Sequence, residues 1–267
     1  MTFESKLCSA ASKNGSWLCV GLDPRVQSLP EGLPSTADGV TSFCHAIIDA
    51  TSDLVCAYKP NIAFFEALGD DGWKTLRRVL QTIPRDIPVI LDAKRGDIGS
   101  TAENYATAYY DDLDVDAVTV SPYMGWDAVE HFAVRPDRCA FVLCLTSNAS
   151  ASEFQELGVD GSKLFQEVAA TAQNWSGNLG LVVGATKPDE LGTVRDLAPQ
   201  MPFLIPGIGM QGGDLVQVVT AAKRDDGTGA VINVSRGVIA ASSGADFAEK
   251  SREAALDYRD RIAQAPS

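Results

Sequence analysis

One short stretch of the chain places acidic and basic side chains directly after an apolar run. Pro88-Val89-Ile90-Leu91 is typical of a buried strand, and Asp92, Lys94 and Asp97 follow at its end. Residues two apart on a strand point to the same side, so Asp92 and Lys94 should lie together. A buried ion pair seldom stabilises a core better than apolar residues do, which favours a chemical role. For Asp92 and Lys94 alone, a structural salt bridge is an equal alternative.

These charges suit one type of reaction. Lys59, which follows another apolar run, is expected to join Lys94, Asp92 and Asp97 in an array of alternating charge. Two opposite charges about 4 Å apart attract by roughly 4 kcal/mol at an effective dielectric constant of 20, which keeps the lysines protonated and the aspartates ionised. The aspartate then disfavours a substrate carboxylate, and the lysine stabilises and protonates the carbanion that remains. Such chemistry replaces a leaving anion with a proton and needs neither an electron-sink cofactor nor a metal.

The elements that position these residues follow a repeating pattern. Eight short apolar runs recur, at residues 18–22, 55–58, 89–91, 117–120, 141–145, 179–183, 203–205 and 230–234, and most are separated by stretches with helical periodicity. Alternating strand and helix predicts an α/β fold with a parallel sheet, and eight repeats predict a single (β/α)8 TIM barrel over residues 1–267. An open doubly wound sheet is the competing architecture, but the first strand lacks the glycine pattern GxGxxG. Ser100 and Glu103 have capping-box spacing, so a helix should begin there.

A barrel gathers the carboxyl ends of its strands on one face, where active sites form. Asp23 ends the first strand, Lys59 the second and Ser147 the fifth. The seventh and eighth strands end in Pro206-Gly207-Ile208-Gly209-Met210-Gln211-Gly212-Gly213 and Ser235-Arg236-Gly237. Glycines let backbone N–H groups approach an anion, a following helix N-terminus adds partial positive charge, and Arg236 offers a bidentate contact. These two loops predict a phosphate site, the alternative being glycines that only make tight turns.

Composition limits the other possibilities. The net charge of −13 argues against a nucleic-acid or acidic-membrane partner, and no apolar run is long enough to span a bilayer. The first residues lack a signal-peptide pattern, and the six cysteines have no metal-ligand spacing, which predicts a cytoplasmic protein. Cys19, Cys56 and Cys144 lie inside apolar runs and are expected to be buried. With only two histidines, a histidine triad or a histidine metal site is not expected.

Together these motifs resemble a known family. Asp92-Ala93-Lys94-Arg95-Gly96-Asp97-Ile98-Gly99-Ser100-Thr101 is similar to the Asp-x-Lys-x-x-Asp signature of the orotidine 5′-phosphate decarboxylases, in the form used by their longer bacterial branch. The other matches occur in the family's order across nearly the whole chain: Leu22-Asp23-Pro24, Lys59-Pro60, Ser147, the glycine-rich loop after strand seven, and Ser235-Arg236-Gly237.

The resemblance implies conversion of orotidine 5′-monophosphate to uridine 5′-monophosphate and CO2, without cofactor or metal, in pyrimidine biosynthesis. It implies that Lys94 is the proton donor, that Asp92 faces the departing carboxylate, and that Lys59 contacts the ribose. It further implies a homodimer with shared active sites, since residues of one subunit would enter its neighbour's site. The remaining implied contacts are Asp97 and Thr101 from the neighbouring subunit, Asp23 and Thr101 at ribose hydroxyls, Ser147 at the pyrimidine, and Gln211 and Arg236 at the phosphate.

Two rival functions fit part of the pattern. A magnesium-dependent sugar-phosphate decarboxylase or aldolase of the same barrel superfamily would use acidic metal ligands at the ends of strands two and three. Lys59 stands where such a ligand is expected, which favours the metal-free reaction. A catalytically silent phosphosugar-binding barrel would have lost the lysines of the array, but Lys59 and Lys94 are both present.

Overall fold

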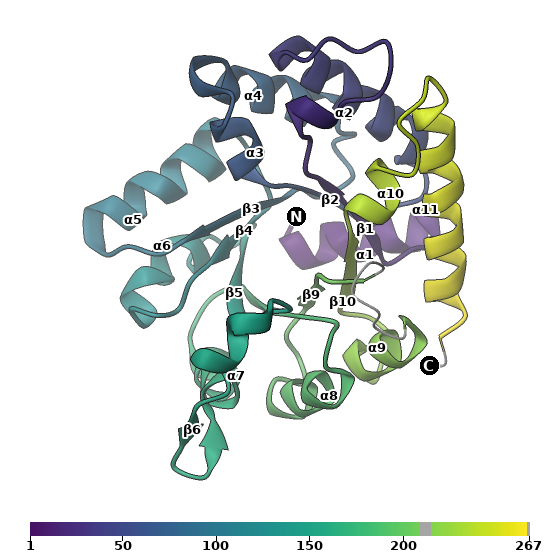
Figure 1. The fold of residues 1–267 in the computed structure, drawn as a ribbon. Helices are drawn as coiled ribbons and strands as arrows, with labels where there is room; N and C mark the ends of the chain where they lie inside the picture. Colours follow the sequence, from purple (N-terminus) through teal and green to yellow (C-terminus); the bar gives the residue numbers. More distant parts are fainter. Residues whose placement is uncertain (209–214, 266–267) are drawn as a thin grey trace.

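The strands form one large sheet and one small hairpin in the computed structural model, which describes residues 1–208 and 215–265 (Figure 1). The large sheet contains β1 (Leu18–Leu22), β2 (Ala57–Pro60), β3 (Ile90–Arg95), β4 (Ala117–Val120), β5 (Cys139–Leu145), β8 (Leu179–Val183), β9 (Phe203–Ile205) and β10 (Ala230–Val234). The hairpin pairs β6 (Gly158–Val159) with β7 (Ser162–Lys163).

The large sheet closes into a barrel. Its order is β2-β1-β10-β9-β8-β5-β4-β3, and each neighbouring pair is parallel. Single bridges join the two end strands, Tyr58 to Val89 and Asn61 to Asp92. The predicted (β/α)8 barrel is therefore confirmed, and the open doubly wound sheet is wrong.

Five strands have the predicted bounds, namely β1, β4, β8, β9 and β10. By contrast, β2 and β3 reach further toward their carboxyl ends and include Lys59 and Lys94. An apolar run marks a strand only where its side chains are buried among other apolar groups. Charged residues continue these two strands beyond the apolar runs, so each run ends before its strand does.

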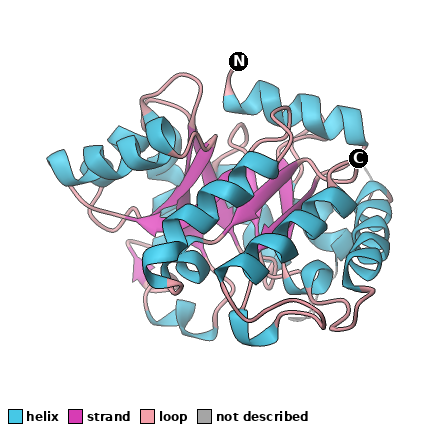
Figure 2. Cartoon of the chain, turned by 90° about the horizontal axis from the view of Figure 1, so that it is seen from above, coloured by secondary structure: helices cyan, strands magenta, loops and turns pink. Residues whose placement is uncertain are grey.

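Helices lie outside the barrel strands, as Figure 2 shows from above. The α-helices are α1 (Phe3–Asn14), α2 (Ala37–Thr51), α3 (Ile62–Glu66), α4 (Gly72–Thr82), α5 (Gly99–Ala106), α6 (Glu130–Ala133), α7 (Leu164–Asn174), α8 (Pro188–Leu197), α9 (Leu215–Ala222), α10 (Arg236–Ile239) and α11 (Phe247–Ala263). Short 3-10 helices occupy Val26–Ser28, Gly69–Asp71, Trp126–Ala128 and Ala149–Glu153, and a π-helical turn occupies Thr107–Asp112. Within residues 1–208 and 215–265, no helix combines the length and the hydropathy that crossing a bilayer requires.

The first helix, α1, covers the amino-terminal end of the barrel and was not predicted. Thr2 caps it by accepting a hydrogen bond from the Ser5 N–H, and Gly15 ends it in the left-handed conformation. Phe3 packs edge-to-face on Phe141 of β5, with 5.6 Å between ring centroids. The spacing of Phe3 and Leu7, both buried, is the signal that would have found this helix.

The segment between Ser147 and Gly180 contains the β6–β7 hairpin and α7. Asp160 and Gly161 form the hairpin turn with φ values of 46° and 95°. Two consecutive residues with positive φ are typical of the tight hairpin turn that Asp-Gly favours. This dipeptide was the available sequence signal for the hairpin.

Candidate active site

An ion-pair cluster lies at the carboxyl ends of β2 and β3. Asp92 accepts hydrogen bonds from two ammonium groups, from Lys59 Nζ at 3.0 Å to Oδ2 and from Lys94 Nζ at 2.5 Å to Oδ1. Asp92 and Lys59 are buried, whereas half of the Lys94 side chain is exposed. The predicted meeting of Asp92, Lys59 and Lys94 therefore exists within one chain, with Lys94 as its most accessible member.

The backbone that brings Lys94 to Asp92 is less regular than a simple strand. Pairing between β3 and β4 shifts register between Leu91 and Arg95, and Lys94 has a φ of 49°. A residue other than glycine seldom adopts such a φ, and strained residues of this kind cluster at active sites. The contact between Asp92 and Lys94 was predicted from their spacing on a regular strand. In the structure the backbone that brings them together is irregular.

The charges of the cluster shift the pKa values of its buried members. Burial of the Asp92 carboxyl acts to raise its pKa, but the ammonium groups of Lys59 and Lys94 outweigh burial and hold the pKa well below the usual range. Burial acts to lower the pKa of Lys59, and the charges of Asp92 and Asp23 raise it above its ordinary value. Both shifts favour the charged forms, as expected for an alternating array.

Acid should therefore destabilise the wild-type protein more than the Asp92→Asn variant. The folded-state pKa of Asp92 is depressed, so its charge contributes stability that is present above the unfolded pKa of about 3.9 and is lost as the pH falls through the lower folded value. Urea unfolding between about pH 6 and pH 2 measures this contribution. We expect the free energy of unfolding to fall more steeply for the wild type below about pH 4. Equal slopes would contradict the depressed pKa.

A cavity of about 220 Å³ adjoins the cluster, and the ends of several strands line it. Lys59 and Asp92 lie in its wall, together with three predicted residues, Asp23, Ser147 and Arg236. Asp23 Oδ1 is buried and has no hydrogen-bond partner among the described residues. A buried carboxylate oxygen without a partner retains the capacity to accept a hydrogen bond from a ligand hydroxyl.

Described residues of the two loops after β9 and β10, which are predicted to bind phosphate, line one side of this cavity. Its described lining residues are Pro206, Gly207, Ile208, Ser235, Arg236 and Gly237. Gly207 has a φ of 99°, a conformation that glycine adopts without strain. On the neighbouring strand, a Cβ on Gly21 would lie 1.9 Å from Ser235 Oγ, so a glycine is needed for β1 to approach this loop. Gln211, predicted to contact phosphate, lies outside the described residues.

Asp97 and Thr101 do not join the cluster of their own chain. Asp97 Oδ1 accepts a hydrogen bond from the Ile98 N–H at 2.9 Å, and no described lysine or arginine forms an ion pair with Asp97. Thr101 is exposed on α5.

The predicted capping box is wrong, because α5 begins at Gly99 and Ser100 lies inside its first turn.

One residue of the site was missed. Thr119 on β4 is 2% exposed, and its hydroxyl lies 3.0 Å from Asp92 Oδ1. In the sequence it is a β-branched residue within an apolar run, which indicates only a strand. Its proximity to Asp92 depends on how β3 and β4 pair.

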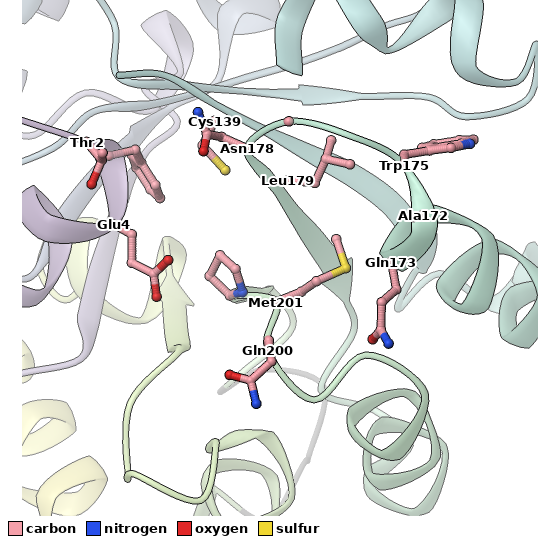
Figure 3. A pocket seen from close by; sticks show the side chains of 13 residues that line it. Thr2, Glu4, Cys139, Ala172, Gln173, Trp175, Asn178, Leu179, Gln200 and Met201 are labelled. Atoms are coloured by element: carbon pink, nitrogen blue, oxygen red, sulfur yellow. The ribbon is translucent and has the colours of Figure 1, made fainter. Parts of the chain in front are cut away.

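A second cavity, of about 350 Å³, lies at the opposite end of the barrel (Figure 3). It is larger, and Glu4, Gln173, Gln200 and Met201 are among its lining residues. The first residues of β5 and β8 line it as well, which places it at the amino ends of the strands. Active sites of such barrels form at the carboxyl ends, where the charged cluster lies. The smaller cavity is therefore the candidate active site.

Comparison with known proteins gives one consistent result. The sequence model of the "Orotidine 5'-phosphate decarboxylase / HUMPS family" matches residues 16–251. A protein of Herpetosiphon aurantiacus named orotidine 5′-phosphate decarboxylase is 52% identical over 260 residues, which are 96% of each chain. A Roseiflexus protein of the same name is 52% identical over 266 residues, which are 98% of this chain and 97% of the relative. The structure of Leishmania donovani OMP decarboxylase superposes with a TM-score of 0.88 at 43% identity, covering 98% of this chain and 97% of that one.

Proposed function

The chain belongs to the orotidine 5′-phosphate decarboxylase / HUMPS family, and we propose that it converts orotidine 5′-monophosphate to uridine 5′-monophosphate and CO2. The observation that carries this proposal is the Lys59–Asp92–Lys94 cluster beside a cavity that also contains Arg236. The cluster offers an anion that would oppose a substrate carboxylate and an ammonium group that would donate the proton replacing that carboxylate. The relatives that are about half identical over nearly the full chain support the same reaction.

In the proposed mechanism the Asp92 carboxylate faces the carboxylate of the bound substrate. Two like charges held together raise the free energy of the ground state, and departure of CO2 relieves the repulsion. The electron pair of the broken carbon–carbon bond stays on the pyrimidine carbon, where the Lys94 ammonium stabilises it. Lys94 Nζ then transfers a proton to that carbon and regains one from solvent.

The cavity supplies contacts for the rest of the nucleotide. Arg236 and the backbone of the two loops would hold the phosphate, with Gln211 added from the segment outside the described residues. Ser147 would contact the pyrimidine, while Lys59 and the unpaired oxygen of Asp23 would hold the ribose. Binding energy gained at the phosphate, remote from the reacting carbon, can then be used to hold the two carboxylates together.

We also propose that the enzyme works as a homodimer with shared sites. Asp97 has no ion pair among the described residues and Thr101 is exposed, as expected if both serve the neighbouring site. Large apolar side chains are exposed next to Asp97 and in the loop after β4, with Ile98 at 54%, Tyr123 at 88% and Met124 at 46%. Such side chains are typical of surfaces that a partner covers.

The magnesium-dependent reactions of the same superfamily are not favoured. The ammonium group of Lys59 lies at the end of β2, where a metal ligand would be required, and it binds Asp92 Oδ2. A cation in that position opposes a second cation by direct repulsion. The relatives about 50% identical to this chain also carry the decarboxylase name.

The test is the loss of orotidine 5′-monophosphate absorbance in a buffer that contains a chelator. We expect the same turnover with and without chelator, because the chain's own lysines supply the positive charge. A folded protein without turnover would reject the decarboxylase. Turnover of this substrate that the chelator removes and added magnesium restores would reject the metal-free mechanism but not the decarboxylase activity.

We propose a cytoplasmic location because the cysteine thiols are free rather than paired in disulfides. All six cysteines are free, and five of them are buried. Burial raises the pKa of each of these five thiols, to about 12 for Cys19 and Cys144, and keeps them in the unreactive protonated form. Free thiols are typical of proteins in a reducing compartment.

A further inference from the structure

The hydroxyl group of Thr119 connects the acidic and basic members of the cluster. Thr119 Oγ1 lies 3.0 Å from Asp92 Oδ1, 3.0 Å from the Ala93 nitrogen and 3.0 Å from the Lys94 nitrogen. The residue is almost fully buried at 2% exposure. One side chain on β4 therefore contacts three consecutive residues of β3.

The chemistry of the groups determines the direction of each hydrogen bond. Backbone N–H groups can only donate, so Thr119 Oγ1 accepts from Ala93 and Lys94 with its two lone pairs. The single hydroxyl hydrogen remains, and the ionised Asp92 carboxylate can only accept it. The hydroxyl then uses its hydrogen and both lone pairs, so these three hydrogen bonds fix the orientation of the Thr119 hydroxyl.

The irregular backbone explains why a side chain is needed here. Between Leu91 and Arg95 the pairing with β4 slips, so the segment 92–94 lies opposite Thr119 alone. In this irregular segment the Thr119 hydroxyl accepts hydrogen bonds from the N–H groups of Ala93 and Lys94. Without the hydroxyl, these two N–H groups would lose this acceptor. Leaving buried N–H groups unpaired is costly, so removing this acceptor should allow the segment to relax. Lys94, with its left-handed φ, is the residue in this segment whose backbone is most strained.

We propose that Thr119 is a positioning residue for decarboxylation, which fixes the Lys94 backbone and the Asp92 carboxylate relative to each other. The proposal rests on the proposed function of the site. Thr119 would not contact substrate, and its effect would pass through the two residues that do. A displacement of catalytic groups by about 1 Å can lower a rate by about 100-fold, so a loss of that order is expected when the hydroxyl is removed.

The central test compares Thr119→Val, which keeps the shape but not the hydroxyl, with Thr119→Ser, which keeps the hydroxyl. For Thr119→Val we expect kcat to fall by about 10- to 100-fold. Calorimetric titration with uridine 5′-monophosphate should give an unchanged stoichiometry and a Kd within about threefold of wild type, because the phosphate and ribose contacts remain. Thr119→Ser should retain kcat within about threefold, because it restores all three hydrogen bonds.

The titration distinguishes positioning from a merely structural role. Partial unfolding would lower kcat together with the number of binding sites, whereas misplacement of Asp92 and Lys94 lowers kcat at full stoichiometry. The matched control is Thr51→Val, which removes a buried hydroxyl bonded at 2.7 Å to both the Ile47 carbonyl and the Tyr58 hydroxyl. Its melting temperature should fall while its kcat stays unchanged.

Three outcomes would overturn the proposal. They are a folded Thr119→Val enzyme with kcat within twofold of wild type, a Thr119→Ser enzyme as impaired as the valine variant, and an equal loss of kcat in Thr51→Val. If Thr119→Val does not fold, Thr119→Ala takes its place, because the smaller side chain leaves room for a water molecule to satisfy the N–H groups. An inactive wild type rejects the proposed function and this inference together, whereas an active wild type with an equally active Thr119→Val rejects this inference alone.

Discussion

Replacing Lys94 by alanine should lower kcat by at least about 10,000-fold while the protein stays folded. Lys94 is the most accessible cation of the cluster, and its Nζ lies 2.5 Å from the carboxylate that faces the departing group in the proposed mechanism. The substitution removes the proton donor and also the charge that stabilises the carbanion. Steady-state assay of orotidine 5′-monophosphate consumption measures the effect.

The control for this variant is Lys250→Ala on α11. Lys250 resembles Lys94 in exposure, 42% against 50%, and also pairs with a carboxylate, that of Glu253. Its loss should leave kcat unchanged. Circular dichroism and binding of uridine 5′-monophosphate establish that the Lys94→Ala protein is folded with an intact cavity. If kcat stayed within tenfold of wild type, the proton would come from another group and the assignment of Lys94 would be wrong.

Mixing two inactive variants, Lys94→Ala and Asp97→Ala, should restore activity. In the proposed dimer, each site takes Lys94 from one subunit and Asp97 from its partner. Random exchange of equal amounts makes half of the dimers mixed, and one of the two sites in each mixed dimer has both residues intact. The expected recovery is therefore about one quarter of wild-type activity. Activity is measured before and after exchange, with native mass spectrometry to count the mixed dimers.

A second mixture serves as the matched control. Asp92 and Lys94 are bonded within one chain, so mixing Asp92→Asn with Lys94→Ala places a defect in every site of the mixed dimer. No recovery is expected from this pair. Absence of recovery in the Lys94→Ala and Asp97→Ala mixture, once mixed dimers are present, would argue against shared sites. Recovery in both mixtures would mean that activity returns for a reason other than shared sites.

Much of the fold was predictable because its signals are local. Apolar β-branched runs mark strands through the burial of consecutive side chains, and five of the eight barrel strands begin and end where those runs do. The predictions differ from the structure where the hydrophobic pattern and the backbone structure do not coincide. Charged residues extended β2 and β3 beyond the apolar runs, and α5 began at Gly99 without the capping box at Ser100. The hairpin β6–β7 was missed although its Asp-Gly turn was visible.

The candidate site was predictable in its residue types and less so in its geometry. Asp92 and Lys94 were recognisable from their place after an apolar run, because charged groups in that position serve a core poorly. Lys59, which is 33 residues before Asp92, required the further inference that parallel strands end on one face. Thr119 could not be recognised, since a threonine in an apolar run is typical of any strand.

By itself, the sequence determined the barrel, the charged residues at its mouth and the family, because burial periodicity and residue chemistry are properties of short segments. Only the tertiary structure decided that Asp92 lies between two ammonium groups, that β3 is irregular at Lys94, and that Thr119 satisfies its backbone. Apart from the Asp92–Lys94 pair within β3, these contacts join residues on different strands. They depend on the register of β3 against β4 and on closure of the ring between β2 and β3. Register and closure result from packing the whole barrel, and no single segment of the chain specifies them.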